Sequence, residues 1–207
     1  SVLISSSLNN IGIAYKKLDS LDLALKYFNQ SLALKNRIGD KMSISSTLAN
    51  IGEISFLKGD YKNAENKYFD SYLLRKAIND QNGLVSVSNK LGELYLQLGL
   101  MKKAKVFLDE GLAISKKIES NELRLNNIKL QVQWYEKQQQ FKKAFEVYKD
   151  YDTLRSQVFD IDKAHIISEL RVKYEAEKNE AQIKSLNEIS ASQAESLKAK
   201  TKAQYAL

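Results

Sequence analysis

The sequence predicts an all-α protein, a right-handed superhelical array of four helical hairpins followed by one long C-terminal helix. Three observations lead to this prediction. Residues recur at a 40-residue interval, beginning with Gly12, Gly52 and Gly92. The chain contains no proline, whereas the loops of mixed folds normally use proline to fix the backbone. Residues 160–207 contain neither glycine nor proline, which favours an uninterrupted helix.

The 40-residue repeat is carried by several independent columns of small and large apolar residues. Internal repeats of this length are typical of solenoid proteins. Because several columns share one period, chance is a poor explanation. Besides the glycines, the columns are Ala24, Ala64, Ala104 and Ala144, then Phe28, Tyr68, Leu108 and Tyr148.

The first period shows how each repeat forms a hairpin of two helices. Apolar residues from Leu8 to Leu18 recur at steps of three and four, which is one face of a helix. The pair Asp19-Ser20 interrupts the pattern and can cap a second helix. Gly39 ends that helix, as glycine commonly does. The later turns are expected at 59–60, 79–80, 99 and 119–120, so the hairpins span about 3–38, 41–79, 83–119 and 121–158.

The small residues of the repeat have a packing role. Gly12 and Ala24 fall where the two helices of a hairpin approach each other, and the aromatic residues fill the space beside them. A glycine inside a helix costs about 1 kcal/mol relative to alanine, so its recurrence indicates close contact between helices.

These columns resemble the tetratricopeptide repeat, whose hairpins show a Leu-Gly, Tyr, Ala, Phe/Tyr, Ala pattern. The pattern stands here as Ile11-Gly12, Tyr15, Ala24, Phe28 and Ser31, and again as Leu91-Gly92, Tyr95, Ala104, Leu108 and Gly111. The resemblance covers residues ~3–158 of an array predicted to span 1–158, and it implies a superhelical array that binds peptides or proteins. The fourth hairpin departs from it, with Gln131-Val132 in place of Leu-Gly.

The segment 159–207 is predicted to be a long signalling or dimerisation helix. Its apolar residues recur at an 11-residue interval, a spacing that suggests a narrow seam against a parallel partner helix. We therefore expect a homodimer; the alternative is an isolated charged helix. The expected seam consists of Val172, Ile183, Leu186, Ala194 and Leu197.

Residues 151–188 resemble an element of Bacteroidetes-type two-component proteins. The matching residues are a Ser-x-x-Phe turn at Ser156 to Phe159 and the helix Ile167 to Lys178. The resemblance implies the signal-input region of a membrane-bound sensor histidine kinase or a helix-turn-helix regulator. This segment would then be periplasmic and reach the membrane only through a flanking segment. The alternative is a free-standing, cytoplasmic scaffold or adaptor.

The sequence offers no catalytic or cofactor-binding constellation. Without cysteine there is no thiolate metal site or cysteine nucleophile, and His165 is the only histidine. The glycines stand singly, so no phosphate-binding loop is expected. The net charge of +7 comes from lysines scattered among acids, which indicates a solvated surface rather than a nucleic-acid site. We expect no enzyme activity, metal, cofactor or nucleic acid for this segment.

The binding surface is expected on the concave face, which the first helix of each hairpin lines in such arrays. Serine and asparagine recur on this face, and asparagine can pair with the backbone of an extended peptide. The equally weighted alternative is that they are ordinary polar residues. The predicted groove residues are Ser6, Asn9, Asn50, Glu53, Phe56, Ser86, Asn89, Glu93, Lys129 and Gln133.

Overall fold

The computed structural model describes the backbone of residues 1–204 and most of their side chains, those of 159–170, 173–174, 176–177 and 191–204 excepted. This backbone is all-helical, as predicted. It divides into two compact units, Ser1–Ser156 and Gln157–Leu207. Its eight helices are α1 (Val2–Lys17), α2 (Leu21–Ile38), α3 (Lys41–Leu57), α4 (Tyr61–Ala77), α5 (Gln81–Gln97), α6 (Met101–Lys117), α7 (Asn121–Lys137) and α8 (Phe141–Gln204).

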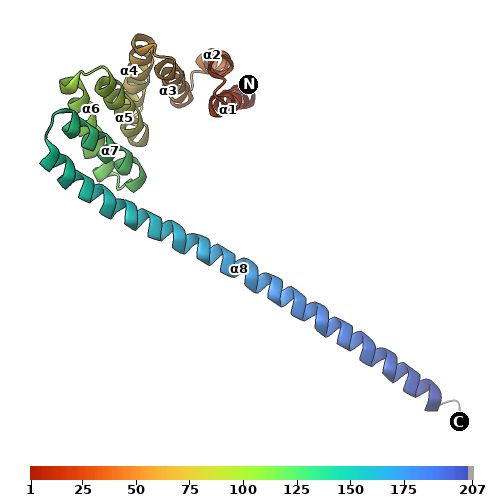
Figure 1. The fold of residues 1–207 in the computed structure, drawn as a ribbon. Helices are drawn as coiled ribbons and strands as arrows, with labels where there is room; N and C mark the ends of the chain where they lie inside the picture. The colour runs from red at the N-terminus through yellow and green to blue at the C-terminus, as the bar shows by residue number, and fades with distance from the viewer. Residues whose placement is uncertain (205–207) are drawn as a thin grey trace. The chain divides into compact units, whose positions relative to one another are not determined.

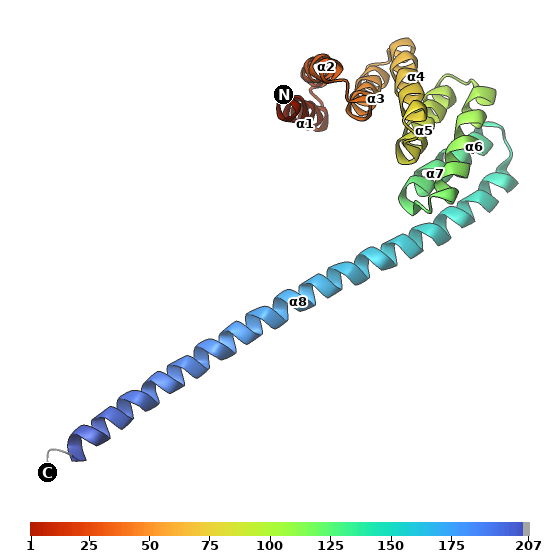
Figure 2. The same cartoon turned by 180° about the vertical axis from the view of Figure 1, so that it is seen from behind.

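The helices of the first unit stack as successive antiparallel hairpins. From α1 to α7 each helix contacts the next one along the chain, and α5 also contacts α3 and α7. Within this unit, α1, α3, α5 and α7 lie on the inner side of an arc, with α2, α4 and α6 on its outer side (Figure 1). The view from behind shows the same two layers (Figure 2). The first helices of the hairpins therefore form the inner face.

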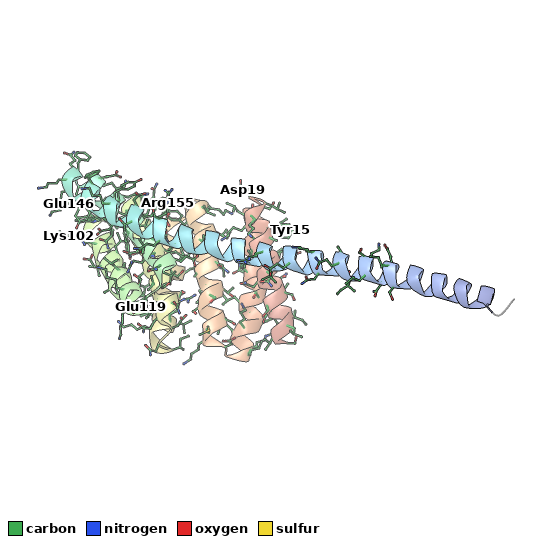
Figure 3. All side chains as sticks on the ribbon, turned by 90° about the horizontal axis from the view of Figure 1, so that it is seen from below. Tyr15, Asp19, Lys102, Glu119, Glu146 and Arg155 are labelled. Atoms are coloured by element: carbon green, nitrogen blue, oxygen red, sulfur yellow. The ribbon has the colours of Figure 1, made fainter. Side chains whose placement is uncertain are left out.

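Every turn between these helices contains one residue with positive φ. The turns within hairpins place Asp19, Gly59, Gly99 and Gln139 there, and those between hairpins place Gly39, Asn79 and Glu119. A left-handed residue ends a helix abruptly and lets the chain reverse. Asp19 and Glu119 mark the two kinds of turn, and they lie at opposite edges of the array (Figure 3). The predicted turn positions are confirmed.

Aspartates cap three of the helices. Asp40, Asp60 and Asp80 each accept a hydrogen bond from the backbone N–H three residues later. This bond satisfies one of the free N–H groups at the start of a helix. Ser20 is the N-cap residue of α2, as predicted, but its side chain makes no capping bond; its hydroxyl donates instead to the carbonyl of Leu18 at 3.5 Å.

The recurring glycines lie against the large residues of the neighbouring helix, as predicted. A Cβ atom added to Gly12 would lie 2.7 Å from the ring of Phe28, and one added to Gly52 would lie 2.6 Å from the ring of Tyr68. Contacts this short are not compatible with a side chain at either position. The glycine column therefore sets how closely the two helices of each hairpin approach.

Apolar contacts continue from each hairpin to the next. Ala24 and Phe28 on α2 pack with Ile51 and Ile54 on α3. A larger cluster joins α4, α5 and α6 and reaches Leu130 and Trp134 on α7. Trp134 lies partly in this core, as expected, and its indole N–H donates to the carbonyl of Met101 at 2.8 Å. The buried apolar residues thus form two clusters, one between α2 and α3 and one from α4 to α7.

The prediction that a separate long helix begins after residue 158 is wrong, because the helix begins at Phe141. The second helix of the fourth hairpin does not end at the expected Ser156–Phe159 turn; α8 runs without interruption from Phe141 to Gln204. No glycine or proline occurs in this span, so nothing in the local sequence stops helix propagation.

Part of the predicted dimer seam can be located on α8. Val172, Ile183 and Leu186 are exposed, while the side chains of Ala194 and Leu197 lie outside the described residues. Dimerisation through this seam stays a prediction. Among the described residues, none of the helices has a stretch that is both long and apolar enough to cross a membrane.

Candidate functional site

The inner face holds most of the predicted groove residues at its surface. Ser6, Glu93, Lys129 and Gln133 are exposed. The partly exposed residues are Asn9, Asn50, Glu53, Phe56 and Ser86. These nine side chains come from all four first helices, so the face is a continuous surface across the hairpins.

The structure corrects the groove assignment of Asn89. Its side chain is only 1% exposed. The Nδ2 group donates to the carbonyl of Leu123 at 3.3 Å, and Oδ1 accepts from Nδ2 of Asn127 at 2.7 Å. A buried amide needs such partners, and these two join α5 to α7. Asn89 therefore connects two hairpins and is not available to a ligand.

The other two asparagines among the predicted groove residues, Asn9 and Asn50, also form hydrogen bonds within the array. Oδ1 of Asn9 accepts from Nδ2 of Asn50 at 3.3 Å and from the hydroxyl of Thr47 at 3.4 Å. Both asparagines remain partly exposed. They join α1 to α3, and any contact with a ligand would use their remaining hydrogen-bonding capacity.

A chain of ion pairs crosses the centre of the inner face. The carboxylate of Glu53 on α3 lies 2.7 Å from Nζ of Lys16 on α1 and 2.7 Å from Nζ of Lys90 on α5. All three side chains are partly shielded from solvent, between 23% and 27% exposed. Glu53 thus bridges three successive hairpins, a role that the sequence spacing did not reveal.

The two lysines decide the ionisation of Glu53. Burial raises the pKa of its carboxyl, but Lys90 and Lys16 together lower it by more, so the pKa lies below the usual value for glutamate. Nearby Tyr68 responds in the opposite direction. Burial raises the pKa of its hydroxyl, and the carboxylates of Glu53 and Glu93 raise it further. The inner face therefore carries a charged Glu53 near pH 7, and the buried Tyr68 on α4 behind it is neutral.

We expect Glu53 to make part of the stability depend on pH. Because its folded pKa is depressed, its stabilising contribution is present above the unfolded value of about 4.3 and is lost as pH falls through the folded pKa. For a partly exposed ion pair the contribution is about 1 kcal/mol or less. Urea unfolding of the wild type and of Glu53→Gln should therefore differ by this amount at pH 7 and converge near pH 3. A difference that stays constant between these pH values would contradict the assignment.

The outer side of the array carries a pocket that sequence reasoning missed. It has a volume of about 540 Å³ and is lined by Glu65, Asn66, Phe69, Tyr95, Lys103, Val106 and Phe107. The hydroxyl of Tyr95 donates to Glu65 at 2.6 Å. The available signal was the apolar character of Phe69 and Val106, since the corresponding positions in other repeats are mostly polar.

The described residues show no cluster of side chains that could hold a metal ion. No group of three or more His, Asp or Glu side chains comes together among them. On the inner face Glu53 pairs with Lys16 and Lys90, and Asn9 bonds to Asn50. Charged and polar side chains of this face can offer a ligand charges and hydrogen bonds. Such a surface suits binding.

Comparison with known proteins agrees with this geometry. Two family models of the tetratricopeptide repeat match the chain, over residues 3–77 and 85–118. No curated protein matches it.

Three solved structures illustrate the likeness of fold. BtubC (BKLC) from P. vanneervenii has 17% identity and a TM-score of 0.69, covering 75% of this chain and 65% of that one. The apo form of RapI has 15% identity and a TM-score of 0.72, covering 77% and 58%. A Podosopora anserina putative kinesin light chain with nearly identical TPR-like repeats has 16% identity and a TM-score of 0.59, covering 74% and 76%. The chain spans less than two thirds of the first two proteins, and identities this low show the fold alone.

Proposed function

Because residues 3–77 and 85–118 carry tetratricopeptide repeats, we propose that this chain is a protein–protein interaction scaffold whose inner face binds an extended peptide segment. The observation that carries the proposal is the ion-paired chain Lys16–Glu53–Lys90, which holds three first helices in register and leaves each side chain partly exposed. A surface whose side chains are already fixed loses less conformational entropy on binding.

The charges of the inner face indicate the kind of segment that fits. Positive and negative side chains alternate along it, from Lys16 and Glu53 to the exposed Glu93 and Lys129. Complementary charges contribute to specificity and to the choice of partner. A peptide of mixed charge suits this pattern better than a strongly anionic ligand, because Glu53 and Glu93 would repel the latter.

The proposal can be tested with peptides selected from a displayed random library against the 207-residue chain. The best peptide is synthesised, and its Kd is measured by fluorescence anisotropy. We expect Glu93→Lys and Lys129→Glu each to weaken binding at least tenfold, about 1.4 kcal/mol. Both side chains are exposed, so the fold should tolerate either change.

Lys102→Glu on α6 is the matched control for Lys129→Glu, since it makes the same charge change at an exposed position outside the inner face. Its Kd should stay within about twofold of the wild type. Two results would show that the inner face is not the binding surface. One is a peptide whose Kd is unchanged by both inner-face variants, and the other is a peptide that no longer binds Lys102→Glu.

A sensor role in a two-component protein is the narrower proposal, and it includes the periplasmic location. It is supported by the resemblance of residues 151–188, whereas the matching family models and similar structures support the scaffold. The sequence of the complete gene is the direct test. A transmembrane stretch of about 20 apolar residues followed by a kinase or regulator domain would support the sensor, and a gene without them would exclude it.

A further inference from the structure

Glu93 on α5 occupies the same position in its repeat as Glu53 on α3, 40 residues earlier. The two carboxylates have different surroundings. Glu53 lies 2.7 Å from Lys16 on α1 and 2.7 Å from Lys90 on α5. Glu93 is exposed, and none of the described basic side chains forms an ion pair with it. Of two equivalent carboxylates, the array therefore supplies cations to only one.

Apolar residues stand in the places of the two lysines around Glu93. Phe56 lies 40 residues after Lys16 in the sequence, and Leu130 lies 40 residues after Lys90. Because α5 contacts both α3 and α7, these two residues flank Glu93 as the lysines flank the earlier carboxylate. Leu130 is buried in the hydrophobic cluster from α4 to α7, and Phe56 packs against that cluster while it remains partly exposed. The surface beside Glu93 is thus apolar where the preceding repeat carries positive charge.

A tyrosine hydroxyl lies near both carboxylates. Tyr68 on α4 is 2% exposed. Burial raises the pKa of its hydroxyl, and the carboxylates of Glu53 and Glu93 raise it further. Phe28 and Leu108, which share its column, have no polar side-chain atom. A buried hydroxyl normally has a hydrogen-bond partner, and this one has none among the described residues. It is therefore a polar group at Glu93 that a ligand can satisfy.

The group that fits beside Glu93 has a positive charge at the end of an apolar stem. Lysine and arginine side chains have both parts, and their stems lie along apolar surface while the charged head stays in water. Phe56 offers the apolar surface, and an aromatic ring also attracts a cation. A carboxylate or phosphate group of a ligand would be repelled by Glu53 and Glu93.

We propose that Glu93 binds a lysine or arginine side chain of the peptide on the inner face, an assignment that rests on the proposed peptide-binding function. The peptide then supplies the cation that the array itself supplies to Glu53. The stem of the basic residue lies on Phe56. Its ammonium or guanidinium group donates to the carboxylate of Glu93 and to the hydroxyl oxygen of Tyr68. The inner face thereby selects a peptide with a basic residue at one fixed position.

The test uses a peptide from the displayed library whose binding is weakened by Lys129→Glu, so that its place on the inner face is established first. Each lysine or arginine of this peptide is replaced singly by glutamine, and Kd is measured for the wild type and for Glu93→Gln. At one peptide position the replacement should weaken binding to the wild type roughly fivefold, the effect of an ion pair of about 1 kcal/mol. The same replacement should change the Kd for Glu93→Gln by less than about twofold, because coupled partners are not additive.

Two variants serve as the control and as the test of the hydroxyl. Glu136→Gln also removes an exposed carboxylate, from α7, and the peptide replacement should still weaken binding to it roughly fivefold. Tyr68→Phe removes only the hydroxyl and places in this column the residue that Phe28 already supplies. It should weaken binding of the unmodified peptide roughly threefold, the effect of one lost hydrogen bond. Circular dichroism checks that all variants remain folded.

Three results would overturn the assignment while leaving the proposed function intact. One is an inner-face peptide that contains no basic residue. Another is a peptide whose basic residues all act additively with Glu93→Gln, or couple to Glu136→Gln instead. The third is a Kd unchanged by Tyr68→Phe, which would remove the hydroxyl from the site. A library that yields no peptide sensitive to Lys129→Glu would contradict the proposed function itself, and the assignment with it.

Discussion

Replacing Phe28 with alanine is expected to lower the free energy of unfolding by about 3–5 kcal/mol. The ring is fully buried and lies between Gly12 on α1 and the cluster of Ala24, Ile51 and Ile54. Because the glycine offers no side chain to fill the space, the cavity can close only if the helices move. Urea unfolding followed by circular dichroism measures the loss.

Tyr148→Ala is the matched control for Phe28→Ala. The two residues share one column of the repeat, but Tyr148 is 47% exposed. Its removal should cost less than about 1 kcal/mol. Equal losses for the two variants would contradict the assignment of Phe28 to the core and of Tyr148 to an exposed position.

The second large effect is expected for Gly52→Ala, which should lose up to about 2 kcal/mol of stability. Helix propensity alone would predict a gain of about 1 kcal/mol, because alanine is the better helix former. The added Cβ would lie 2.6 Å from the ring of Tyr68, and overpacking of this kind costs about 1–3 kcal/mol. The contact outweighs the propensity because both helices are held on their other sides by neighbouring hairpins.

A double-mutant cycle isolates this contact. In the Tyr68→Ala background the ring is absent, so Gly52→Ala should be neutral or stabilise the protein by up to about 1 kcal/mol. The change of sign between the two backgrounds is the decisive measurement. A loss of similar size in both would mean that the glycine is needed for a reason other than the tyrosine ring.

The left-handed residues in the turns could be predicted from the 40-residue repeat even where the residue type gave no indication. A left-handed backbone conformation can be expected at Gly39, Gly59 and Gly99 because glycine adopts it readily. It cannot be expected from the residue type at Glu119 and Gln139. Their φ values of 55° and 56° were predictable only in outline, from the period that aligns them with the glycines. Position in the repeat was a better guide to these turns than the propensity of the individual residue.

On the inner face, alignment of the repeats does not predict which polar side chains are exposed. Asn9 and Asn89 share a column, yet the first is partly exposed and the second is buried between α5 and α7. The hydroxyl of Thr47 lies 3.4 Å from Oδ1 of Asn9, whereas the longer side chain of Asn127, at the equivalent position, donates to Oδ1 of Asn89 at 2.7 Å. Whether a polar residue serves a ligand or a neighbouring helix depends on a partner 38 residues away, and periodicity along one helix does not contain that information.

The sequence by itself determined the all-helical array, because its period, its turn residues and its glycine–aromatic contacts are local or recur at a fixed interval. Only the tertiary structure decided that Glu53 joins three hairpins and that Asn89 is buried between α5 and α7. The physical reason is that ion pairing and burial depend on which helices are neighbours in space, and the order of residues along one helix does not contain that information.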